Sequence, residues 1–428
     1  MHHRTPDRSS ADSSGRPPAS GPAPTRRGLL GAAATTGVAG LAVGGAGSTL
    51  ARTALTADSG PALTTLGSTA HSFHGTHQPG ITTPVQAHGH LAAFDLAPGA
   101  DRRLAAGLLR RWSATAEDLM AGRPTTEDTG VARDAGPSSL TVTFGFGYSF
   151  FDATGLAEDR PDALAPLPAF SADTLDARRS EGDLWVQIGA DDALVAFHAL
   201  RALQRAAGDA ASVRWQMTGF NRTPGATARP MTTRNLMGQV DGTNNLKESD
   251  EDFAGRVFVP DGGEPSWMAG GSYAVVRRIR MLLDDWEELD LTSQERVIGR
   301  RKADGAPLTG GEETTPLELD ATGPDGRPVI PANAHARITA PEANGGAAML
   351  RRSFSYHDGF RDDGAPDAGL LFVCWQADPR RGFVPVQRKL DRGDALSAFI
   401  RHEASGLFAV PGGPRPGEYV GQRLIEGR

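Results

Sequence analysis

The sequence predicts an α+β protein built from two consecutive ferredoxin-like units. Each unit contains four apolar stretches typical of strands and two segments with helical spacing, in the order β-α-β-β-α-β. The same order occurs twice along the chain, and a unit of this kind forms an antiparallel sheet covered by helices. We expect the two sheets to pack together into a dimeric α/β-barrel-like body.

The first unit is expected within residues 58–230. Leu104, Leu108 and Trp112 recur at helical spacing, and Asp191 stands where a helix would begin. The predicted elements are a strand at 90–96, a helix at 101–120, strands at 140–146 and 183–188, a helix from 191 to about 207, and a strand at 213–217.

The second unit is expected within residues 231–428. Its predicted elements are a strand at 272–283, two helical pieces around 284–301, strands near 351–356 and 369–376, a helix over about 380–402, and a strand at 407–410. Residues 303–334 are rich in Gly, Pro, Asp and Thr and predict a long inserted loop. Ordered loops of this length usually serve the function of a protein.

The N-terminal residues 1–57 are typical of an export signal rather than of part of the folded body. Arg26 and Arg27 precede Gly28, Leu29 and Leu30, and a weakly apolar run follows. This resembles a twin-arginine signal, so we expect the protein to use the twin-arginine export machinery and to act outside the cytoplasm. A membrane-spanning helix is the alternative, but Ala and Gly dominate the run and make it a weak anchor.

Charge and cysteine content narrow the classes of function. The formal net charge is −7, and residues 1–57 contribute six arginines against two acids, so the remaining body is more acidic still. Such a body is a poor binder of nucleic acid, and small-molecule chemistry is favoured. Cys374 is the only cysteine, so no internal disulfide can form. It lies in an apolar run and is expected to be buried and inert.

A short glycine-rich stretch contains the first candidate for chemistry, Asp241. Taken alone, Gly238-Gln239-Val240-Asp241-Gly242-Thr243 could be an ordinary turn. It resembles, however, the G-x-x-D-G motif of dye-decolorising (DyP-type) haem peroxidases. The resemblance implies that Asp241 is the distal acid-base above haem b, and that Gly238, Gly242 and Thr243 lie against the cofactor, where a glycine lets the backbone approach closely.

The same resemblance selects the iron ligand among eleven histidines. His335, in the stretch Asn333 to Pro341, is similar to the proximal histidine segment of that family, so it is expected to be the axial ligand of the haem iron. An acid usually accepts a hydrogen bond from the other ring nitrogen of such a ligand, and Asp394 and Glu403 both remain open for this role. The alternatives for a metal site are the N-terminal histidines, whose spacing matches no strong template: His71, His74, His77, His88 and His90.

A catalytic arginine is also implied. The stretch Met349 to Tyr356 resembles the arginine strand of the family, and Tyr356 follows Arg351 at the family's spacing. Adjacent residues on a strand face opposite sides, so only one arginine can reach the pocket. We assign Arg351, with Arg352 as the alternative. An arginine here would stabilise negative charge as the O–O bond of peroxide breaks.

The strand 369–376 resembles the family's distal wall. Leu370 and Phe372 alternate onto one face and are expected to line the cofactor pocket. Trp375 and Tyr356 are candidate electron relays for bulky donors, although the favoured interpretation is that both are ordinary core aromatics.

The resemblance extends over residues 70–415 and implies a peroxidase that reduces hydrogen peroxide and oxidises dyes, phenolics or other small one-electron donors. The exported branch of the family includes the peroxidase linked to iron uptake, so release of iron from haem (deferrochelatase activity) is an alternative, and a non-enzymatic haem carrier or sensor is another. A neighbouring guanidinium favours the ionised form of Asp241, so an acidic activity optimum is expected. The sequence leaves open whether the chain forms a homo-oligomer.

Overall fold

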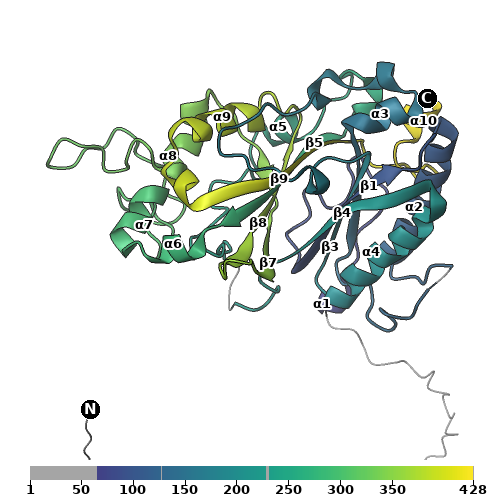
Figure 1. Cartoon of the computed structure of the whole chain (residues 1–428), viewed down its shortest axis with the longest axis horizontal. Coiled ribbons are helices and arrows are strands. Elements are labelled where there is room, and N and C mark those ends of the chain that lie inside the picture. The colour runs from purple at the N-terminus through teal and green to yellow at the C-terminus, as the bar shows by residue number, and fades with distance from the viewer. Residues whose placement is uncertain (1–64, 127, 228–230, 428) are drawn as a thin grey trace, which may run out of the picture. The chain divides into compact units, whose positions relative to one another are not determined.

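The computed structural model describes residues 65–126, 128–227 and 231–427 of the 428-residue chain (Figure 1). The described residues belong to one compact unit. The predicted export signal, residues 1–57, lies outside the described residues. Within the described ranges, no helix is long and apolar enough to cross a membrane.

The first half folds around a four-stranded antiparallel sheet in the order β2-β3-β1-β4. This is the ferredoxin-like order: β1 and β2 follow each other in the chain, but β3 lies between them in the sheet. Helices α2 and α4 pack side by side against one face of the sheet (Figure 1). The elements are α1 (Thr65–Ser68), β1 (His88–Leu96), α2 (Arg102–Met120), β2 (Thr141–Gly147), α3 (Tyr148–Thr154), β3 (Leu184–Ala190), α4 (Ala193–Ala207) and β4 (Ala211–Phe220).

Aspartates begin both long helices of this half. The Asp101 carboxylate accepts from the Leu104 backbone N–H, and that of Asp192 accepts from Leu194 and Val195. The cap of α4 is therefore Asp192 and not the predicted Asp191. The Asp191 side chain instead accepts from the Ala87 backbone N–H at 3.0 Å and fixes the start of β1.

The second half repeats the arrangement in the order β9-β5-β8-β7, with the two-residue β6 also beside β8. Helices α6, α7, α8 and α9 lie on the side away from the first half, whereas α10 packs beside α2 of the first half (Figure 1). The elements are α5 (Phe253–Val257), β5 (Ser272–Met281), α6 (Leu283–Glu287), α7 (Leu291–Ile298), α8 (His335–Thr339), β6 (Leu350–Arg351), β7 (Phe354–Phe360), β8 (Pro366–Gln376), α9 (Phe383–Gly393), β9 (Ile400–Val410) and α10 (Gln422–Glu426).

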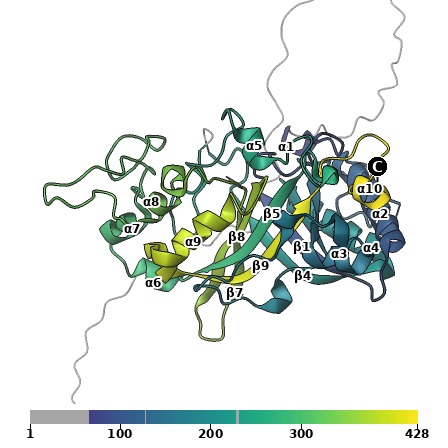
Figure 2. The same ribbon diagram turned by 90° about the horizontal axis from the view of Figure 1, so that it is seen from above.

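Two short pairings close the sheets into a ring. Strand β2 pairs with β9 at Phe146 and Gly147, and β4 pairs with β7 through Phe220 and Ser355. Figure 2 shows the strands of both halves around a shared interior. Large apolar side chains from both halves fill it, namely Leu91, Trp185, Trp215, Phe354, Tyr356, Leu371, Val373, Trp375 and Phe408. The prediction of two ferredoxin-like units paired in a barrel-like body is confirmed.

Two predicted elements differ from the structure in their bounds. The expected strand at 351–356 is present as β6 and β7, which pair with β8 in one continuous register; only Arg352 and Ser353 between them fall outside the strands, although the Arg352 backbone N–H still donates to the Val373 carbonyl at 2.8 Å. The expected helix over 380–402 ends at Gly393, and the chain returns to the sheet at Ile400, opposite Met281 of β5.

The predicted loop at 303–334 contains no helix or extended strand. Arginine side chains hold its backbone carbonyls. Arg234 donates to the carbonyls of Lys302 and Ala303, Arg300 to those of Gly305 and Glu313, and Arg337 to those of Leu319 and Ile330. The loop is therefore fixed against the body although it has no regular structure.

Candidate active site

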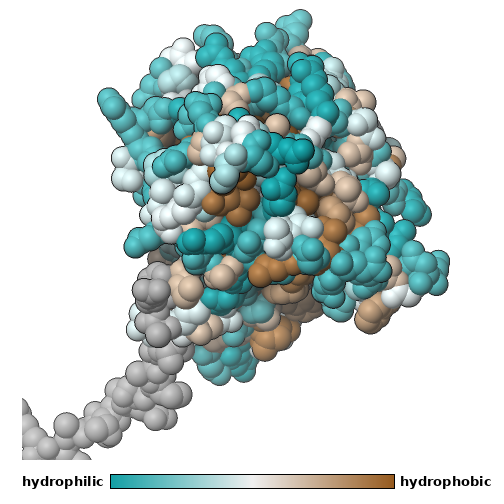
Figure 3. Space-filling view, turned by 90° about the vertical axis from the view of Figure 1, so that its left-hand side faces the viewer, coloured by the Kyte–Doolittle hydropathy of each residue, from teal (hydrophilic) through white to brown (hydrophobic). Residues whose placement is uncertain are grey.

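A cavity of about 230 Å³ lies between the sheet of the second half and helices α7, α8 and α9. A single water needs roughly 10–15 Å³, so this space is large enough for a sizeable organic ligand. Its walls combine apolar side chains with a few polar ones, as in cofactor and substrate sites generally. The outer surface on the side of these helices is hydrophilic over most of its area, with apolar side chains gathered from its middle toward its lower right (Figure 3).

One wall of the cavity is a strand face. On β8, Leu370 and Phe372 point into the cavity, while Leu371 and Val373 point into the barrel interior. Strand β5 alternates in the same way and contributes Ile279 to the cavity. The structure thus places Leu370 and Phe372 where the sequence predicted them.

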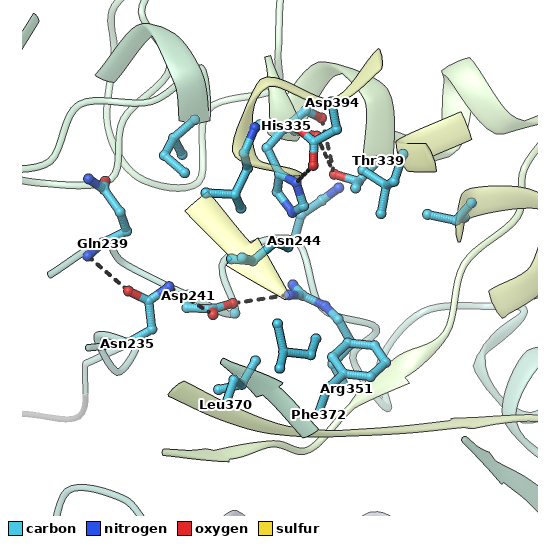
Figure 4. Close-up of a pocket in the computed structure, with 18 of the residues that line it drawn as sticks. Asn235, Gln239, Asp241, Asn244, His335, Thr339, Arg351, Leu370, Phe372 and Asp394 are labelled. Carbon is cyan, nitrogen blue, oxygen red and sulfur yellow. Dashed lines mark hydrogen bonds and ion pairs between the residues drawn. The ribbon is translucent and has the colours of Figure 1, made fainter. Parts of the chain in front are cut away.

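His335 stands on the opposite wall, at the first residue of α8 (Figure 4). Its Nδ1 lies 2.8 Å from Oδ2 of Asp394, which is almost completely buried. Burial alone would lower the pKa of His335, but the charge and hydrogen bond of Asp394 outweigh it and raise the pKa above its usual value. The carboxylate accepts the Nδ1 proton, which leaves the Nε2 lone pair free to bind a metal.

The open question of the acid that accompanies His335 is answered by this contact. Asp394 follows α9 directly, and its second oxygen accepts from the Leu396 backbone N–H at 3.1 Å. Glu403 instead forms ion pairs with Arg278, Arg280 and Arg361.

Asp241 and Arg351 meet in the same cavity, facing His335 from the other side (Figure 4). Arg351 Nη1 lies 3.0 Å from Asp241 Oδ1, and Asn235 donates to the other carboxylate oxygen at 3.2 Å. Asn245 holds the backbone of Arg351 at both its N–H and its carbonyl, each at 2.8 Å. Both groups are thus fixed in position before any ligand binds.

The structure separates the two adjacent arginines as predicted for a strand. Arg352 points away from the cavity and donates to the Thr83 carbonyl at 2.8 Å and to Gln86. It is almost completely buried, and this burial lowers its pKa to about 10. Arg351 is therefore the arginine that lines the cavity, and Arg352 ties the second half to the first.

Of the three residues of the glycine-rich stretch that were expected to lie against the cofactor, only two reach the cavity. Gly242 and Thr243 line the cavity, whereas Gly238 does not. Gly238 has φ +79° and Gly242 φ +127°, a region that other residues rarely adopt. Gly238 therefore serves the turn that presents Asp241. Thr243 donates to the Glu313 side chain at 2.9 Å and so connects the long loop to the cavity.

The other candidates lie away from the cavity. Trp375 and Tyr356 are fully buried in the barrel interior, and Trp375 packs against Trp185 with ring centroids 5.8 Å apart. Cys374 is buried as predicted, and burial raises the pKa of its thiol. Among the described residues, no cluster of three or more His, Cys, Asp or Glu side chains could hold a metal ion, so the N-terminal histidines form no such site.

Sequence reasoning missed four basic or amide side chains at the cavity: Arg277, Arg300 and His402 line it, and Asn245 positions Arg351. Arg277 lies in the apolar strand Ser272–Met281 with side-chain exposure of only 1%. A charged residue at a cavity-facing position of a buried strand was the signal that could have revealed it.

Two family models match the chain in succession: "Dyp-type peroxidase, N-terminal" over residues 78–221 and "Dyp-type peroxidase, C-terminal" over residues 232–415. The dye-decolorizing peroxidase of Thermobifida fusca is 50% identical over 362 residues, covering 82% of this chain and 84% of that protein. The deferrochelatase of Escherichia coli K12 is 36% identical over 369 residues, covering 82% and 86%.

Solved structures agree. Ferric DtpA from Streptomyces lividans aligns with a TM-score of 0.84 and 73% identity, covering 86% of this chain and 100% of that chain. A DyP-type peroxidase from Cellulomonas bogoriensis aligns with a TM-score of 0.80 and 44% identity, covering 84% and 99%. The chain therefore belongs to the Dyp-type peroxidase family.

Proposed function

We propose that this protein is a haem-dependent peroxidase that reduces hydrogen peroxide and oxidises small one-electron donors such as dyes and phenolics. Family membership supports the reaction class. The observation that carries the assignment of residues is the cavity itself, which brings the Asp241–Arg351 pair and the His335–Asp394 pair to opposite sides of one space.

The lining residues fit a haem. A metal can bind at the Nε2 atom of His335, because Asp394 takes the other ring nitrogen. Leu370 and Phe372 supply apolar contacts for a flat porphyrin. Three buried polar atoms on the walls have no hydrogen-bond partner among the described residues, namely Gln239 Nε2, Arg277 Nε and His402 Nδ1, so the cavity is built for a ligand with polar groups as well.

When bound, the haem would supply the iron that takes up the oxidising equivalents of the peroxide. Asp241 takes the proton from the inner peroxide oxygen and delivers it to the outer one, which leaves as water. Arg351 stabilises the negative charge that develops on the departing oxygen. Asn235 and Asn245 orient these two groups, and Asp394 keeps the His335 ring in the tautomer that can bind iron.

The proposal is tested with purified full-length protein. The parent should show a Soret band, which His335→Ala should lose. Mixed rapidly with peroxide, the parent spectrum should change within milliseconds, whereas Asp241→Ala and Arg351→Ala should react far more slowly while keeping their haem. A protein that stays colourless with abundant haem, or variants that react as fast as the parent, would refute it.

A second candidate is deferrochelatase activity, the release of iron from haem with the porphyrin intact. It is favoured by the 36% identity to the deferrochelatase of Escherichia coli K12, and it would use the same cavity. Metal-free porphyrin, detected by its fluorescence after incubation with haem, would support this activity. A carrier or sensor has no need of Asp241 and Arg351 beside the ligand, so the pair favours an enzyme over either.

Export by the twin-arginine route is part of the proposal. It is supported by the arginine pair Arg26-Arg27 and the weakly apolar run that follows. Arg26→Lys with Arg27→Lys should leave the protein in the cytoplasm, and unchanged export of this variant would contradict the route.

A further inference from the structure

The residues that line the cavity, among those the structure describes, all belong to the second half, between Asn235 and His402. The first half therefore places none of its described side chains beside the proposed chemistry. Its contacts with the second half nevertheless begin directly after Arg351, at the next residue of the chain. These contacts give the first half a way to act on the cavity without reaching it.

Arg352, the residue after Arg351, extends its side chain into the first half and is only 2% exposed. Its Nε donates to the Thr83 carbonyl at 2.8 Å, and its Nη2 donates to the Pro84 carbonyl at 3.3 Å and to the Gln86 side chain. All three acceptors lie in one short segment immediately before β1. Hydrogen bonds from a charged donor are roughly twice as strong as neutral ones, so this side chain is held firmly.

The Gln86 side chain is fixed in the orientation that Arg352 requires. It is buried, and its amide nitrogen donates to the Ser139 carbonyl at 2.9 Å and to the Thr141 hydroxyl at 3.0 Å. The amide oxygen is therefore left to accept from Arg352. A Cβ at Gly189 of β3 would lie 2.5 Å from this oxygen, so the glycine leaves the space that Gln86 needs. The acceptor is thus built into the sheet of the first half.

The next two residues along the chain are held by the first half as well. Asn221, which directly follows β4, donates to the Ser353 carbonyl at 3.0 Å. Phe354 lies against two glycines, because a Cβ at Gly89 of β1 or at Gly219 of β4 would come within 2.6 Å of its side chain. The stretch after Arg351 is therefore docked on the first half at three consecutive residues.

This docking reaches Arg351 through the backbone. Consecutive Cα atoms are held about 3.8 Å apart by a planar peptide bond, so a shift of residue 352 also shifts residue 351. The Arg351 guanidinium must stay 3.0 Å from Asp241, on the side of the cavity that faces His335 (Figure 4). A displacement of about 1 Å at a catalytic group can slow a reaction by roughly 100-fold.

We propose that Arg352 is a positioning residue for the peroxidase reaction: by donating to Thr83, Pro84 and Gln86, it lets the first half fix the place of Arg351 beside Asp241. The inference rests on the proposed function, because it takes Arg351 as the group that stabilises charge on the departing oxygen. It also gives the first half a part in the reaction that does not require any of its side chains to line the cavity.

The test makes two measurements on purified full-length protein loaded with haem. The first is the equilibrium affinity for fluoride, a small anion that binds iron and accepts a hydrogen bond from a donor beside it. This affinity does not depend on turnover and reports where the Arg351 guanidinium lies. The second is the rate constant for the reaction with peroxide in stopped-flow mixing. Arg351→Ala defines the full loss in both measurements.

The main variant is Arg352→Met, which keeps a long unbranched side chain but removes every donor. Because Arg351 is then less firmly held, fluoride binding should weaken by roughly 10-fold and the peroxide reaction should slow by roughly 10- to 100-fold, at unchanged haem content. Gln86→Leu changes the first half alone and provides the answer if Arg352→Met does not fold. It should reduce both quantities by roughly 2- to 10-fold, as expected for the loss of one hydrogen bond.

The matched control is Gln78→Leu. Gln78 is a second buried glutamine before β1, and its side chain holds the Phe144 backbone of β2 and the Pro411 carbonyl that follows β9. The control should lose stability, as Gln86→Leu does, but keep the fluoride affinity and the peroxide rate of the parent.

Parent values of both quantities in Arg352→Met and in Gln86→Leu would overturn the inference and leave the proposed function intact. Equal losses in Gln78→Leu would also overturn it, because they would then follow from reduced stability alone. A parent protein that binds no haem, or a peroxide reaction that Arg351→Ala does not slow, would refute the proposed function and this inference with it.

Discussion

Replacing Asp394 with asparagine should reverse the proton arrangement of His335 while conserving shape. In the structure one Asp394 oxygen accepts from the Leu396 backbone N–H and the other from His335 Nδ1. The single oxygen of an asparagine can satisfy only one of these donors. If it stays with Leu396, the amide NH₂ faces His335, so Nδ1 must become the acceptor and the proton must move to Nε2, the atom that would bind iron.

The cost follows from the contact that is lost. A hydrogen bond to a charged group contributes about 1.5–3 kcal/mol, and loss of the hydrogen-bond partner of a metal-bound histidine changes metal affinity by roughly 10- to 100-fold. We therefore expect Asp394→Asn to raise the haem dissociation constant by roughly 10- to 100-fold. The unfolding midpoint of the cofactor-free protein should move little, because the contact to Leu396 can persist.

The assay is a Soret titration of cofactor-free protein, with the rate of haem transfer to an excess of another haem-binding protein as a second measure. Glu403→Gln is the control, since Glu403 is the other acid that the sequence left open and it lies in the arginine network of β5. Equal haem affinity and an equal spectrum in Asp394→Asn and the parent would refute the role given to this carboxylate.

Three further outcomes are expected. Asp241→Ala should slow the reaction with peroxide by roughly 10²- to 10⁴-fold in stopped-flow mixing, at unchanged haem content, and a parent-like rate would remove Asp241 from the reaction. Burial and then the charge of His88 lower the pKa of His90 to about 4, so between pH 6.5 and 4 only the unfolded chain takes up this proton. The free energy of unfolding should therefore fall by up to about 3 kcal/mol as the pH drops through that window. Urea unfolding at pH 7 and 4.5 should show a smaller loss of stability in His90→Asn than in the parent, and an equal loss would contradict the reasoning. Gly242→Ala must adopt φ +127° and should lose about 1–3 kcal/mol of stability by thermal unfolding, whereas Gly255→Ala in α5, with open space around it, should not.

The sequence was sufficient for the fold wherever a local pattern decided the element. The apolar spacing of Leu104, Leu108 and Trp112 predicted α2, and alternation predicted that Leu370 and Phe372 share one face of β8. Prediction from the sequence failed where pairing with a strand distant in the chain determined the element. The helix predicted to run to residue 402 ends at Gly393, because residues from Ile400 onward are paired along β5, more than 100 positions earlier in the chain.

In the candidate site too, residues in recognisable local stretches could be predicted, and residues selected by distant contacts could not. Asp241, His335 and Arg351 could be selected because each lies in a recognisable local stretch, and the structure brings all three to one cavity. The choice of Asp394 over Glu403 could not be made, since it depends on where the chain leaves α9 relative to α8, 59 positions away from His335. Arg277 was missed because its neighbours in the sequence are those of an ordinary buried strand.

The position of β9 bears on when the molecule can be assembled. This last strand lies between β5 of its own half and β2 of the other, and its pairing of Phe408 with Gly147 joins residues more than 250 positions apart. Both the closure of the ring and the cavity wall at His402 must wait until β9 has been synthesised and has left the ribosome. Contacts so distant in sequence are slow to form. Capture of the prosthetic group is thus expected only after β9 has paired.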